Sequence, residues 1–492
     1  MTSTARVTVA GESMLIGGGL SPAASGEFLT VENPARRGSV ITEIPRGGAA
    51  DVDRAVKAAA AAWPAWSNAH WRERGRALLD IADAVDADLE RLARLLATET
   101  GNAIRTQARP EIKNVVDIFR YFGGLASQLK GETIPMGSDA LSFTIRESWG
   151  VVAAIVPWNA PAALAVLKIA PALAAGNTVV IKPSTDAPLT VLAIARMCAE
   201  HLPPGALNVV TGTGEEVGTP LAAHPLVGKL SFTGNTATGR GLLKLAADRI
   251  VPTTLELGGK SPAIVFPDAN DDRAVAGVID AMRFTRQGQS CTAGSRLLVH
   301  RSIFDEFVDR LGKALAKLRV GDPLDEATDI GAIINRQQFE RVCAYVSEAA
   351  VQPGARLVVG GLPPTTGPLV EGYFAIPTVF ADVPSDWRIV REEIFGPVLV
   401  ALPWDDEDEA IRMANDTHYG LAAYVFTHDI TKGLRAAQRI DAGWIQVNQG
   451  RGGVPGHSFG GYKQSGFGRE FSLEGMLESY TQRKNITVNL ER

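Results

Sequence analysis

The feature that most constrains the fold is a regular alternation of short β-rich runs and helical runs between Val151 and Leu257. Strands joined by crossover helices must pair in parallel, so the alternation predicts a doubly wound α/β domain with ligands at the carboxyl ends of its strands. The predicted strands cover Val151–Val156, Thr178–Ile181, Leu207–Val210, Lys229–Phe232 and Thr254–Leu257, and the predicted helices cover Ala162–Ala174, Leu189–Glu200, Glu215–Ala222 and Thr236–Ala247.

Packing helices are predicted before this series, and a second α/β series is predicted after it, from Pro262 to Asn448. A helix over Ala55–Trp63 is expected to be interrupted by Pro64. Apolar residues at three- and four-residue spacing then predict one long helix from Trp71 to Thr100, and a further helix is predicted over Ile112–Leu129.

The tail from Tyr480 to Leu490 reads as a strand. A terminal strand this far from its own sheet often pairs with another subunit. We therefore expect a homo-oligomer, either a dimer or a tetramer.

Charge and hydropathy narrow the class of partner. The 492 residues carry 49 basic and 54 acidic side chains that are interspersed, giving a net charge of −5. The absence of a basic stripe or a polybasic amphipathic segment argues against nucleic acid and membrane partners, so a small-molecule partner is expected. The most apolar stretch, Pro161 to Ala175, is too short for a bilayer and contains Lys168.

Cysteine usage points to a reducing compartment. Cys198, Cys291 and Cys343 are too few and too scattered for a disulfide framework or a metal knuckle, and the seven histidines show no ligand spacing. Residues 1 to 20 lack the charged and apolar regions of a signal peptide. We therefore expect a cytoplasmic protein without a bound metal.

Cys291 lies in the loop Gly288–Gly294, between a predicted helix (Asp271–Arg286) and a predicted strand (Arg296–Val299). Small neighbours leave its sulfur uncrowded, as attack on a ligand requires. A free intracellular cysteine is more often a small buried hydrophobe, so the interpretation depends on the other segments.

Two further polar residues follow strands of the first series. Asn159 stands at a helix entrance, where its amide either caps the helix or donates to a developing oxyanion. Glu256 lies among apolar and glycine residues, where desolvation raises the pKa of a carboxyl group towards the range of a general base. The alternative for Glu256 is an ion pair with Lys260.

Several segments suit a dinucleotide. Lys182 ends a strand and either binds ribose or phosphate or is a solvated loop residue. Thr211–Gly218 matches the glycine fingerprint weakly, whereas Phe232–Gly239 joins a strand to a helix whose N-terminus can receive a phosphate. Glu392–Pro397 offers a carboxylate for ribose and an aromatic face for a flat ring. The glycine-dense Phe459–Glu470 allows close backbone approach, unless it is a flexible surface loop.

A thiol, an amide donor, a semi-buried carboxylate and a phosphate-binding crevice together are what oxidation of an aldehyde through a thioester requires. The chain resembles the NAD(P)-dependent aldehyde dehydrogenase superfamily over nearly its whole length. The motifs that carry the resemblance are Pro157-Trp158-Asn159, Lys182-Pro183-Ser184, Phe232-Thr233-Gly234, Leu255–Pro262, Gly288-Gln289-Ser290-Cys291, Glu392–Pro397 and Phe459–Lys463.

The resemblance implies an architecture and a chemistry. It implies a Rossmann-like cofactor-binding domain (1–124 and 148–259), an α/β catalytic domain (260–456) and a small β oligomerisation arm (125–147 and 479–492). Cys291 would attack the aldehyde carbon, and the Asn159 side chain and the backbone N–H of Cys291 would hold the oxyanion. Hydride would pass to the nicotinamide, and water activated by Glu256 would hydrolyse the thioester.

The resemblance also assigns the cofactor contacts. The adenosine ribose falls to Lys182, the pyrophosphate to Trp158 and the Gly234-Asn235 turn, the nicotinamide ribose to Glu393 and the ring to Phe395. The implied cofactor-binding residues are Ile155, Val156, Trp158, Lys182, Ser184, Thr185, Gly214, Gly234, Asn235, Leu257, Gly258, Glu393 and Phe395.

Two departures from the family pattern concern the cofactor. Asn235 stands where many members have serine, and its amide can still bind phosphate. Thr185 stands where NAD-preferring members commonly have glutamate, whose carboxylate would repel a 2′-phosphate. We therefore expect the cofactor to be NAD or NADP, with NADP tolerated.

A third departure concerns the substrate tunnel. Ala160 replaces a common phenylalanine, Leu167 a common tryptophan, and Gly452-Gly453 an aromatic that often narrows the entrance. A wider channel favours a bulky aldehyde, such as an aromatic or terpenoid one. Arg451 either meets a substrate carboxylate or is solvated. The expected tunnel residues are Ala160, Leu164, Leu167, Ser290, Thr292, Arg451, Gly453 and Phe459.

Three alternatives to aldehyde oxidation fit the sequence less well. In a CoA-acylating dehydrogenase CoA would take the acyl group, and a water-activating Glu256 would serve no purpose. A non-catalytic structural or binding protein would not need Cys291, Glu256 and Asn159 together. A cofactor-free cysteine hydrolase leaves the nucleotide crevice unexplained.

Overall fold

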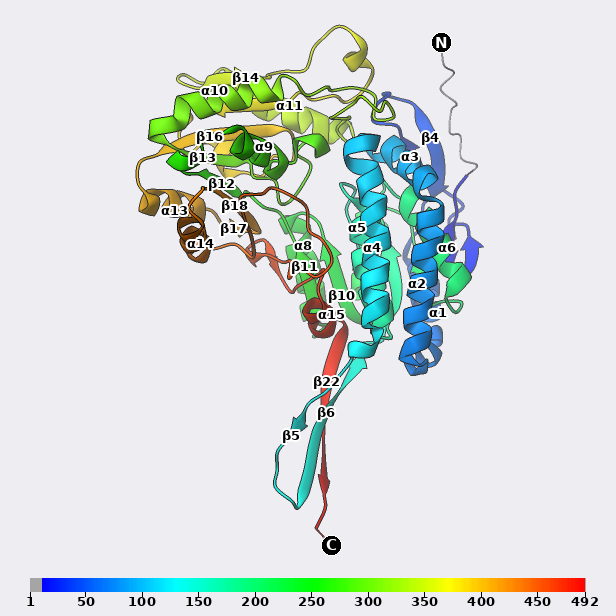
Figure 1. The fold of residues 1–492 in the computed structure, drawn as a ribbon. Helices are drawn as coiled ribbons and strands as arrows, with labels where there is room; N and C mark the ends of the chain where they lie inside the picture. Colours follow the sequence, from blue (N-terminus) through cyan, green and yellow to red (C-terminus); the bar gives the residue numbers. More distant parts are fainter. Residues whose placement is uncertain (1–10, 492) are drawn as a thin grey trace.

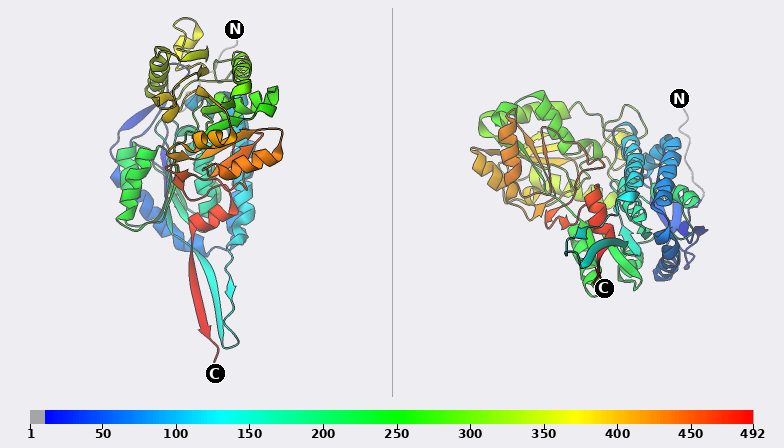
Figure 2. Two further views of the ribbon diagram at one scale, coloured as in Figure 1. Left: turned by 90° about the vertical axis from the view of Figure 1, so that its left-hand side faces the viewer. Right: turned by 60° about the horizontal axis from the view of Figure 1, so that its bottom comes forward.

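The computed structural model describes residues 11–491, so the first ten residues of the segment without signal-peptide features lie outside them. Two α/β bodies lie beside each other, and a slender β arm projects from their base (Figures 1 and 2). None of the helices within residues 11–491 is long and apolar enough to cross a membrane.

An eight-stranded sheet forms the centre of the first body, in the order β2-β1-β9-β8-β7-β10-β11-β21. β7 to β11 pair in parallel, which confirms the doubly wound prediction, and β1, β2 and β21 join antiparallel. The bounds are β1 Met14–Ile16, β2 Gly19–Ser21, β7 Val151–Ile155, β8 Thr178–Lys182, β9 Leu207–Val209, β10 Val227–Thr233, β11 Thr253–Glu256 and β21 Gly466–Phe467.

Helices cover both faces of this sheet (Figure 1). Val152 and Ala154 of β7 pack into the cluster that contains α2 to α6, whereas Val151, Ala153 and Ile155 pack with α1, α7 and α8. The bounds are α1 Ala49–Asn68, α2 Trp71–Ala87, α3 Leu89–Thr100, α4 Arg109–Leu125, α5 Pro161–Ala174, α6 Leu189–His201, α7 Thr219–Ala223 and α8 Thr236–Ala247.

Three helix predictions were wrong at their boundaries. α1 continues through Pro64, because the indole of Trp66 donates to the Leu173 carbonyl and holds the last turn against the body. The long helix predicted over Trp71–Thr100 breaks at Asp88, whose backbone leaves the helical region. The helix predicted to end at Arg286 ends at Ala281, because Arg283 adopts a left-handed conformation (φ 58°).

A seven-stranded sheet forms the second body, in the order β14-β15-β16-β13-β12-β18-β19, parallel except for β14. Its strands are β12 Pro262–Val265, β13 Arg296–His300, β14 Arg356–Val359, β15 Thr378–Ala381, β16 Val398–Trp404, β18 Ala422–Phe426 and β19 Trp444–Val447. Its helices are α9 Asp272–Ala281, α10 Phe304–Leu315, α11 Arg336–Ala350, α12 Arg388–Arg391, α13 Glu407–Asn415 and α14 Ile430–Arg439.

The link Leu257–Ser261 joins the two sheets, because β11 ends at Glu256 and β12 begins at Pro262. The carboxyl end of β11 therefore lies close to the amino ends of β12 and its parallel neighbour β13. This junction brings the strand-end residues of one body to the Cys291 loop of the other.

The arm is a three-stranded sheet in the order β22-β6-β5 (Thr481–Asn489, Ala140–Ser148 and Thr133–Ile134). Its C-terminal strand, β22, directly follows α15 (Leu473–Tyr480). The tail is a strand, as predicted, but it pairs with β6 of its own chain, from Thr481↔Ser148 to Asn489↔Ala140. The arm therefore supplies an intramolecular neighbour for the tail on one edge, and the homo-oligomer stays a prediction. The outer edge of β22 has no neighbour among the described strands. Two small ladders complete the fold, β3–β4 (Phe28–Glu32, Val40–Pro45) and β17–β20 (Tyr419–Gly420, Tyr462–Lys463).

Candidate active site

The strand-end residues meet at one edge of the eight-stranded sheet. Ile155, Lys182, Thr233 and Glu256 end β7, β8, β10 and β11, and the register pairs Ile155 with Lys182 and Thr233 with Glu256. The prediction that the unusual polar residues cluster at carboxyl ends is therefore confirmed.

Cys291 occupies a tight turn in front of this edge. The N–H of Ala293 donates to the Ser290 carbonyl (3.1 Å), so Cys291 and Thr292 are the central residues of the turn. The turn lies directly against the inter-sheet link, because a Cβ added at Gly259 would stand 2.3 Å from the Cys291 carbonyl oxygen. Glycine at 259 is what permits this approach.

The Cys291 side chain is half-buried. Burial, followed by the carboxylates of Glu393 and Glu256, raises the pKa of its thiol to about 12. Two acidic side chains therefore lie within electrostatic reach of the sulfur. Since the thiolate is disfavoured, the sulfur needs a base to accept its proton before it can attack.

The Asn159 amide points to the Cys291 loop and does not cap a helix. Its Nδ2 donates to the Gln289 carbonyl at 3.0 Å, whereas Ala160 occupies the N-cap of α5 without a side-chain cap. An amide nitrogen carries two hydrogens, so one N–H is left for another acceptor. Asn102, which the sequence did not single out, donates to the Asn159 carbonyl at 3.3 Å.

Glu256 is buried and unpaired. Glu256 is only 2% exposed to solvent. Neither of its carboxylate oxygens has a hydrogen-bond partner within residues 11–491. The expected alternative, an ion pair with Lys260, is not formed, because the Lys260 ammonium donates to the Ile389 carbonyl at 2.8 Å. Burial, and then the Glu470 carboxylate, raises the pKa of Glu256 well above its usual range.

A buried ion pair lies behind Glu256. The Lys168 ammonium donates to Glu470 at 2.7 Å and to the Ser231 hydroxyl at 3.0 Å, and both charged side chains are inaccessible to solvent or nearly so. Sequence analysis missed this pair. The available signal was a lone lysine in an apolar helix, which must find a partner when buried.

A second carboxylate of the site, that of the half-buried Glu393, lies against the inter-sheet link. Glu393 accepts from the Gly259 N–H at 2.9 Å, and burial raises its pKa to about 7. A Cβ at Gly258 would stand 2.5 Å from the Glu393 carboxylate, so the two segments form a close cradle. Phe395, held at φ 61°, meets Trp158 edge-on at 5.3 Å between ring centroids.

Lys182 and the start of α8 form the rest of this part of the site. The Lys182 ammonium is bonded to the Pro183 carbonyl (2.9 Å), and burial lowers its pKa to about 8. Asn235 caps α8 by accepting from the Thr238 N–H, which leaves its Nδ2 and the helix N-terminus for an anion. These residues fit a dinucleotide. Gly214 instead lies exposed in the short helical turn Gly214–Gly218.

Thr185 is half-buried, and the residue after it carries a charge that the sequence analysis did not consider. The Asp186 carboxylate accepts from Asn335 at 3.0 Å and acts electrostatically on Lys182. The Asp186 carboxylate therefore places a negative charge next to Thr185, the position at which this chain lacks the glutamate common in NAD-preferring members.

The predicted tunnel residues differ in their exposure. Ala160, Leu167, Thr292 and Phe459 are buried, Leu164, Ser290 and Gly453 are half-buried, and Arg451 is exposed. A Cβ at Gly453 would touch the Phe471 ring at 3.5 Å, and this ring packs on Phe459 at 5.7 Å. Phe471, which the sequence analysis missed, therefore fills part of the space that an aromatic at 453 would take.

The glycine-dense segment Phe459–Glu470 is packed into the site and is not a free surface loop. The Ser465 hydroxyl donates to the Gly258 carbonyl (2.7 Å) and accepts from the Gly420 N–H (2.9 Å). A Cβ at Gly466 would stand 1.9 Å from the Leu255 carbonyl oxygen. The prediction of close backbone approach is confirmed.

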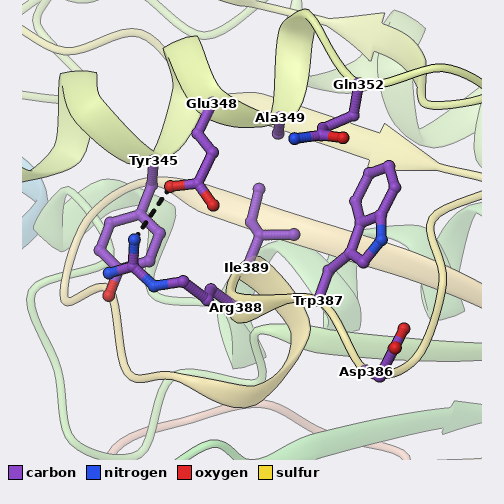
Figure 3. Close-up of a pocket in the computed structure, with 8 residues that line it drawn as sticks. All are labelled: Tyr345, Glu348, Ala349, Gln352, Asp386, Trp387, Arg388 and Ile389. Carbon is purple, nitrogen blue, oxygen red and sulfur yellow. Dashed lines mark hydrogen bonds and ion pairs between the residues drawn. The ribbon is translucent and has the colours of Figure 1, made fainter.

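A separate cavity of about 260 Å³ lies on the second body, at α11 and α12, and is shown in Figure 3. It contains none of the site residues predicted from the sequence. Its lining residues are Tyr345, Glu348, Ala349, Gln352, Asp386, Trp387, Arg388 and Ile389.

The model of the aldehyde dehydrogenase family matches residues 21–486. The chain belongs to the aldehyde dehydrogenase family. An aldehyde dehydrogenase of this family oxidises an aldehyde with a nicotinamide dinucleotide, and the strand-end residues and the Cys291 turn described above are consistent with that activity.

Relatives and solved structures agree with this assignment. The aldehyde dehydrogenase is 42% identical over 479 residues to hydroxyisobutyraldehyde dehydrogenase of Mycolicibacterium austroafricanum, with 97% of this chain and 94% of the relative covered. It is 42% identical over 482 residues to acetaldehyde dehydrogenase 2 of Cupriavidus necator, with 96% and 94% covered. Crystal structures of PnpE from Pseudomonas sp. WBC-3 and of PnpE in complex with nicotinamide adenine dinucleotide each match at 40% identity and TM-score 0.95, covering 98% of both chains.

Proposed function

We propose that Cys291, Asn159 and Glu256 carry the aldehyde oxidation. The observation that supports this most is the pairing of a half-buried thiol with a buried carboxylate whose two oxygens have no partner in the described chain. A structural glutamate would be paired, since an isolated buried carboxylate is costly. Glu256 is left free to accept a proton.

The chemistry follows from the placement of these groups. Cys291 passes its thiol proton to the unpaired Glu256 carboxylate and attacks the aldehyde carbon, and the free Asn159 N–H and the backbone N–H of Cys291 bind the oxyanion. Glu393 and Phe395 would hold the nicotinamide, which would supply the hydride acceptor when bound. Glu256, after releasing the thiol proton to solvent, takes a proton from the water that cleaves the Cys291 thioester, and the raised pKa of its carboxyl group makes the ionised form a stronger base.

We further propose that the substrate is bulky. This rests on the small residues Ala160 and Gly453 and on Leu167, although Phe471 occupies some of the space beside Gly453. The two relatives are named for short aldehydes, so the test must include both size classes.

The proposed cofactor preference is NAD with NADP tolerated. Thr185 carries no charge that would repel a 2′-phosphate, and Lys182 offers a cation beside it. Asp186 opposes this effect, so we expect a moderate preference for NAD.

The remaining proposals concern organisation. We assign residues 1–124 and 148–259 to cofactor binding, 260–456 to catalysis and 125–147 with 479–492 to an oligomerisation arm of a dimer or tetramer. The three cysteines are free thiols, which supports a cytoplasmic location.

The test is NAD(P)H formation across an aldehyde panel of short aliphatic, hydroxylated aliphatic, aromatic, terpenoid and semialdehyde substrates, with and without CoA. We expect acid as the product without CoA, and higher kcat/KM for benzaldehyde-sized substrates than for acetaldehyde. Equal activity on acetaldehyde would contradict the bulky substrate, and an acyl-CoA product would favour the CoA-acylating alternative. A kcat/KM ratio of NAD over NADP above about a thousandfold, or about 4 kcal/mol, would contradict the cofactor proposal.

A further inference from the structure

A hydrogen-bonded bracket joins the Cys291 turn to the segment at the expected mouth of the channel. It consists of Tyr424 of β18, Arg283 after α9, and the carbonyl groups of Thr292, Gly450 and Arg451 that they contact. None of these contacts is required by the chemistry assigned to Cys291, Asn159 and Glu256.

Tyr424 fixes the exit of the turn. Its side chain is fully buried, and its hydroxyl donates to the Thr292 carbonyl at 2.8 Å. Thr292 follows Cys291 in the same turn, so this bond orients the peptide next to the sulfur. The Tyr424 ring also meets Trp444 edge-on, at 6.4 Å between centroids, which limits the movement of the hydroxyl.

Arg283 ties the hydroxyl to the channel segment. Its guanidinium donates to the Gly450 carbonyl at 2.6 Å, to the Arg451 carbonyl at 2.7 Å and, more weakly, to the Tyr424 hydroxyl at 3.5 Å. The planar fork of an arginine can serve several acceptors at once, which a point charge cannot. A donor that carries a charge also strengthens the next bond in the chain, from Tyr424 to Thr292.

The other end of the bracket is also fixed. Gln446, the cross-strand neighbour of Tyr424, donates a second hydrogen bond to the Arg451 carbonyl at 2.7 Å. Gly450 packs directly on α9, because a Cβ there would stand 2.3 Å from the Ala281 nitrogen. Both ends of the bracket are therefore anchored to the second α/β body.

We propose that Arg283 and Tyr424 are positioning residues of the aldehyde oxidation, which hold the Cys291 turn in register with the channel segment Gly450–Arg451. Neither residue exchanges a proton with the substrate or is bonded to Cys291. Their effect is on how often the sulfur and a bound aldehyde meet in a reactive geometry. The proposal holds for any aldehyde that the enzyme oxidises, so it does not depend on the bulky-substrate proposal.

The test compares Tyr424→Phe, Arg283→Met and the double variant in the full-length enzyme, by the single-turnover rate of NADH formation at saturating aldehyde. Tyr424→Phe keeps the ring and leaves the Thr292 carbonyl without its donor, and we expect a rate about tenfold lower for every aldehyde oxidised. The KM for NAD should stay within about twofold. Arg283→Met should lower the rate by a similar factor and also raise the KM for aldehyde.

The double variant separates positioning from general destabilisation. If both residues act through one bracket, its rate should lie within about threefold of the slower single variant. Independent effects would multiply to about a hundredfold and would overturn the proposal. A Tyr424→Phe rate within twofold of the wild type would also overturn it, and this variant alone decides the matter if Arg283→Met does not fold.

Tyr373→Phe is the matched control. Tyr373 is also buried, and its hydroxyl donates to Glu32 at 3.0 Å and to no residue of the bracket. This variant should lower the melting temperature about as much as Tyr424→Phe but leave the single-turnover rate unchanged. An equal fall in rate for both variants would show a general packing effect and contradict the proposal.

Discussion

At the scale of single residues, Cys291 is distinguished from the other two thiols by its surroundings. Cys198 is buried in the core and Cys343 lies half-buried on α11, whereas Cys291 lies on a turn within electrostatic reach of two carboxylates. We expect Cys291→Ala to lower kcat by about a thousandfold or more, because the covalent step is lost. Cys343→Ser should keep kcat within about twofold, and NADH formation measures both. Activity retained in Cys291→Ala would revive a non-covalent or non-catalytic role.

The sequence could predict the three reactive residues of the site, but not the charged residues packed around them. Cys291, Asn159 and Glu256 follow from residue type and from their place at strand ends, because parallel topology brings such ends together. The partners of Glu256 could not be predicted this way. Lys168 and Glu470 are 302 positions apart, and only the packing of α5 against the C-terminal segment makes them a pair.

The Lys168–Glu470 ion pair predicts how substitutions shift the pH dependence of kcat. The Glu470 carboxylate raises the pKa of Glu256, so Glu470→Gln should lower that pKa, and the Lys168 charge left behind acts in the same direction. Glu256 works as a base only when ionised. The acidic limb of the kcat profile should therefore move to lower pH.

Lys168→Met is the opposite test, since the Lys168 ammonium lowers the pKa of Glu256. Its removal should move the acidic limb to higher pH. A shift of both variants in the same direction would show that the limb does not report Glu256. Melting temperatures are measured in parallel, because breaking a buried pair costs about 3–5 kcal/mol.

At the scale of elements, the strand series was predicted well, whereas helix ends were not. Strand positions depend on local apolar runs, but Pro64 is carried inside α1 by the tertiary contact of Trp66 with Leu173. Asp88 ends α2 although the apolar spacing continues through Leu92 and Leu96. The spacing of apolar residues predicts which face of a helix is buried, but it does not predict the residue at which one helix ends and the next begins.

The loop before the nucleophile predicts a sharp requirement for glycine. Gly288 has φ 63°, and a Cβ there would stand 2.1 Å from the Gly396 carbonyl oxygen. Gly288→Ala should lower the free energy of unfolding by about 2 kcal/mol or more, through strain and collision with backbone. It should also lower kcat, because the Cys291 turn and the Phe395 segment are pushed apart.

Gly124→Ala is the control for that substitution. Gly124 is exposed near the end of α4, and a Cβ there would meet nothing within 4 Å. The change should stabilise the protein by up to about 1 kcal/mol, since alanine favours helix. Urea unfolding compares the two variants, and an equal loss of stability would contradict the steric argument.

The loop after β8 predicts the cofactor preference. In Thr185→Glu a carboxylate adds to Asp186 near Lys182, so the binding of a 2′-phosphate should weaken. We expect the kcat/KM ratio of NAD over NADP to rise about tenfold or more. Thr185→Gln, which adds a similar volume without charge, should leave the ratio within about threefold. A similar ratio change in both variants would assign the effect to size.

At the scale of the whole molecule, the arm predicts assembly. Leu141 and Val488 are cross-strand partners in the β6–β22 ladder, and both are about 40% exposed, at 41% and 40%. Exposed apolar pairs on a projecting sheet are typical of a surface that another chain covers, and the outer edge of β22 is unpaired within the described chain. We expect light scattering to give the mass of a dimer or a tetramer.

The variant that tests this surface is Leu141→Lys combined with Val488→Glu. The opposite charges face each other across the ladder, so the arm itself should keep its pairing while its apolar face becomes polar. The mass should fall to that of a smaller species with an unchanged circular dichroism spectrum. Leu357→Lys, on an exposed strand of the catalytic body, should leave the mass unchanged. An assembly that survives the arm variant would mean that the subunits are held by another surface.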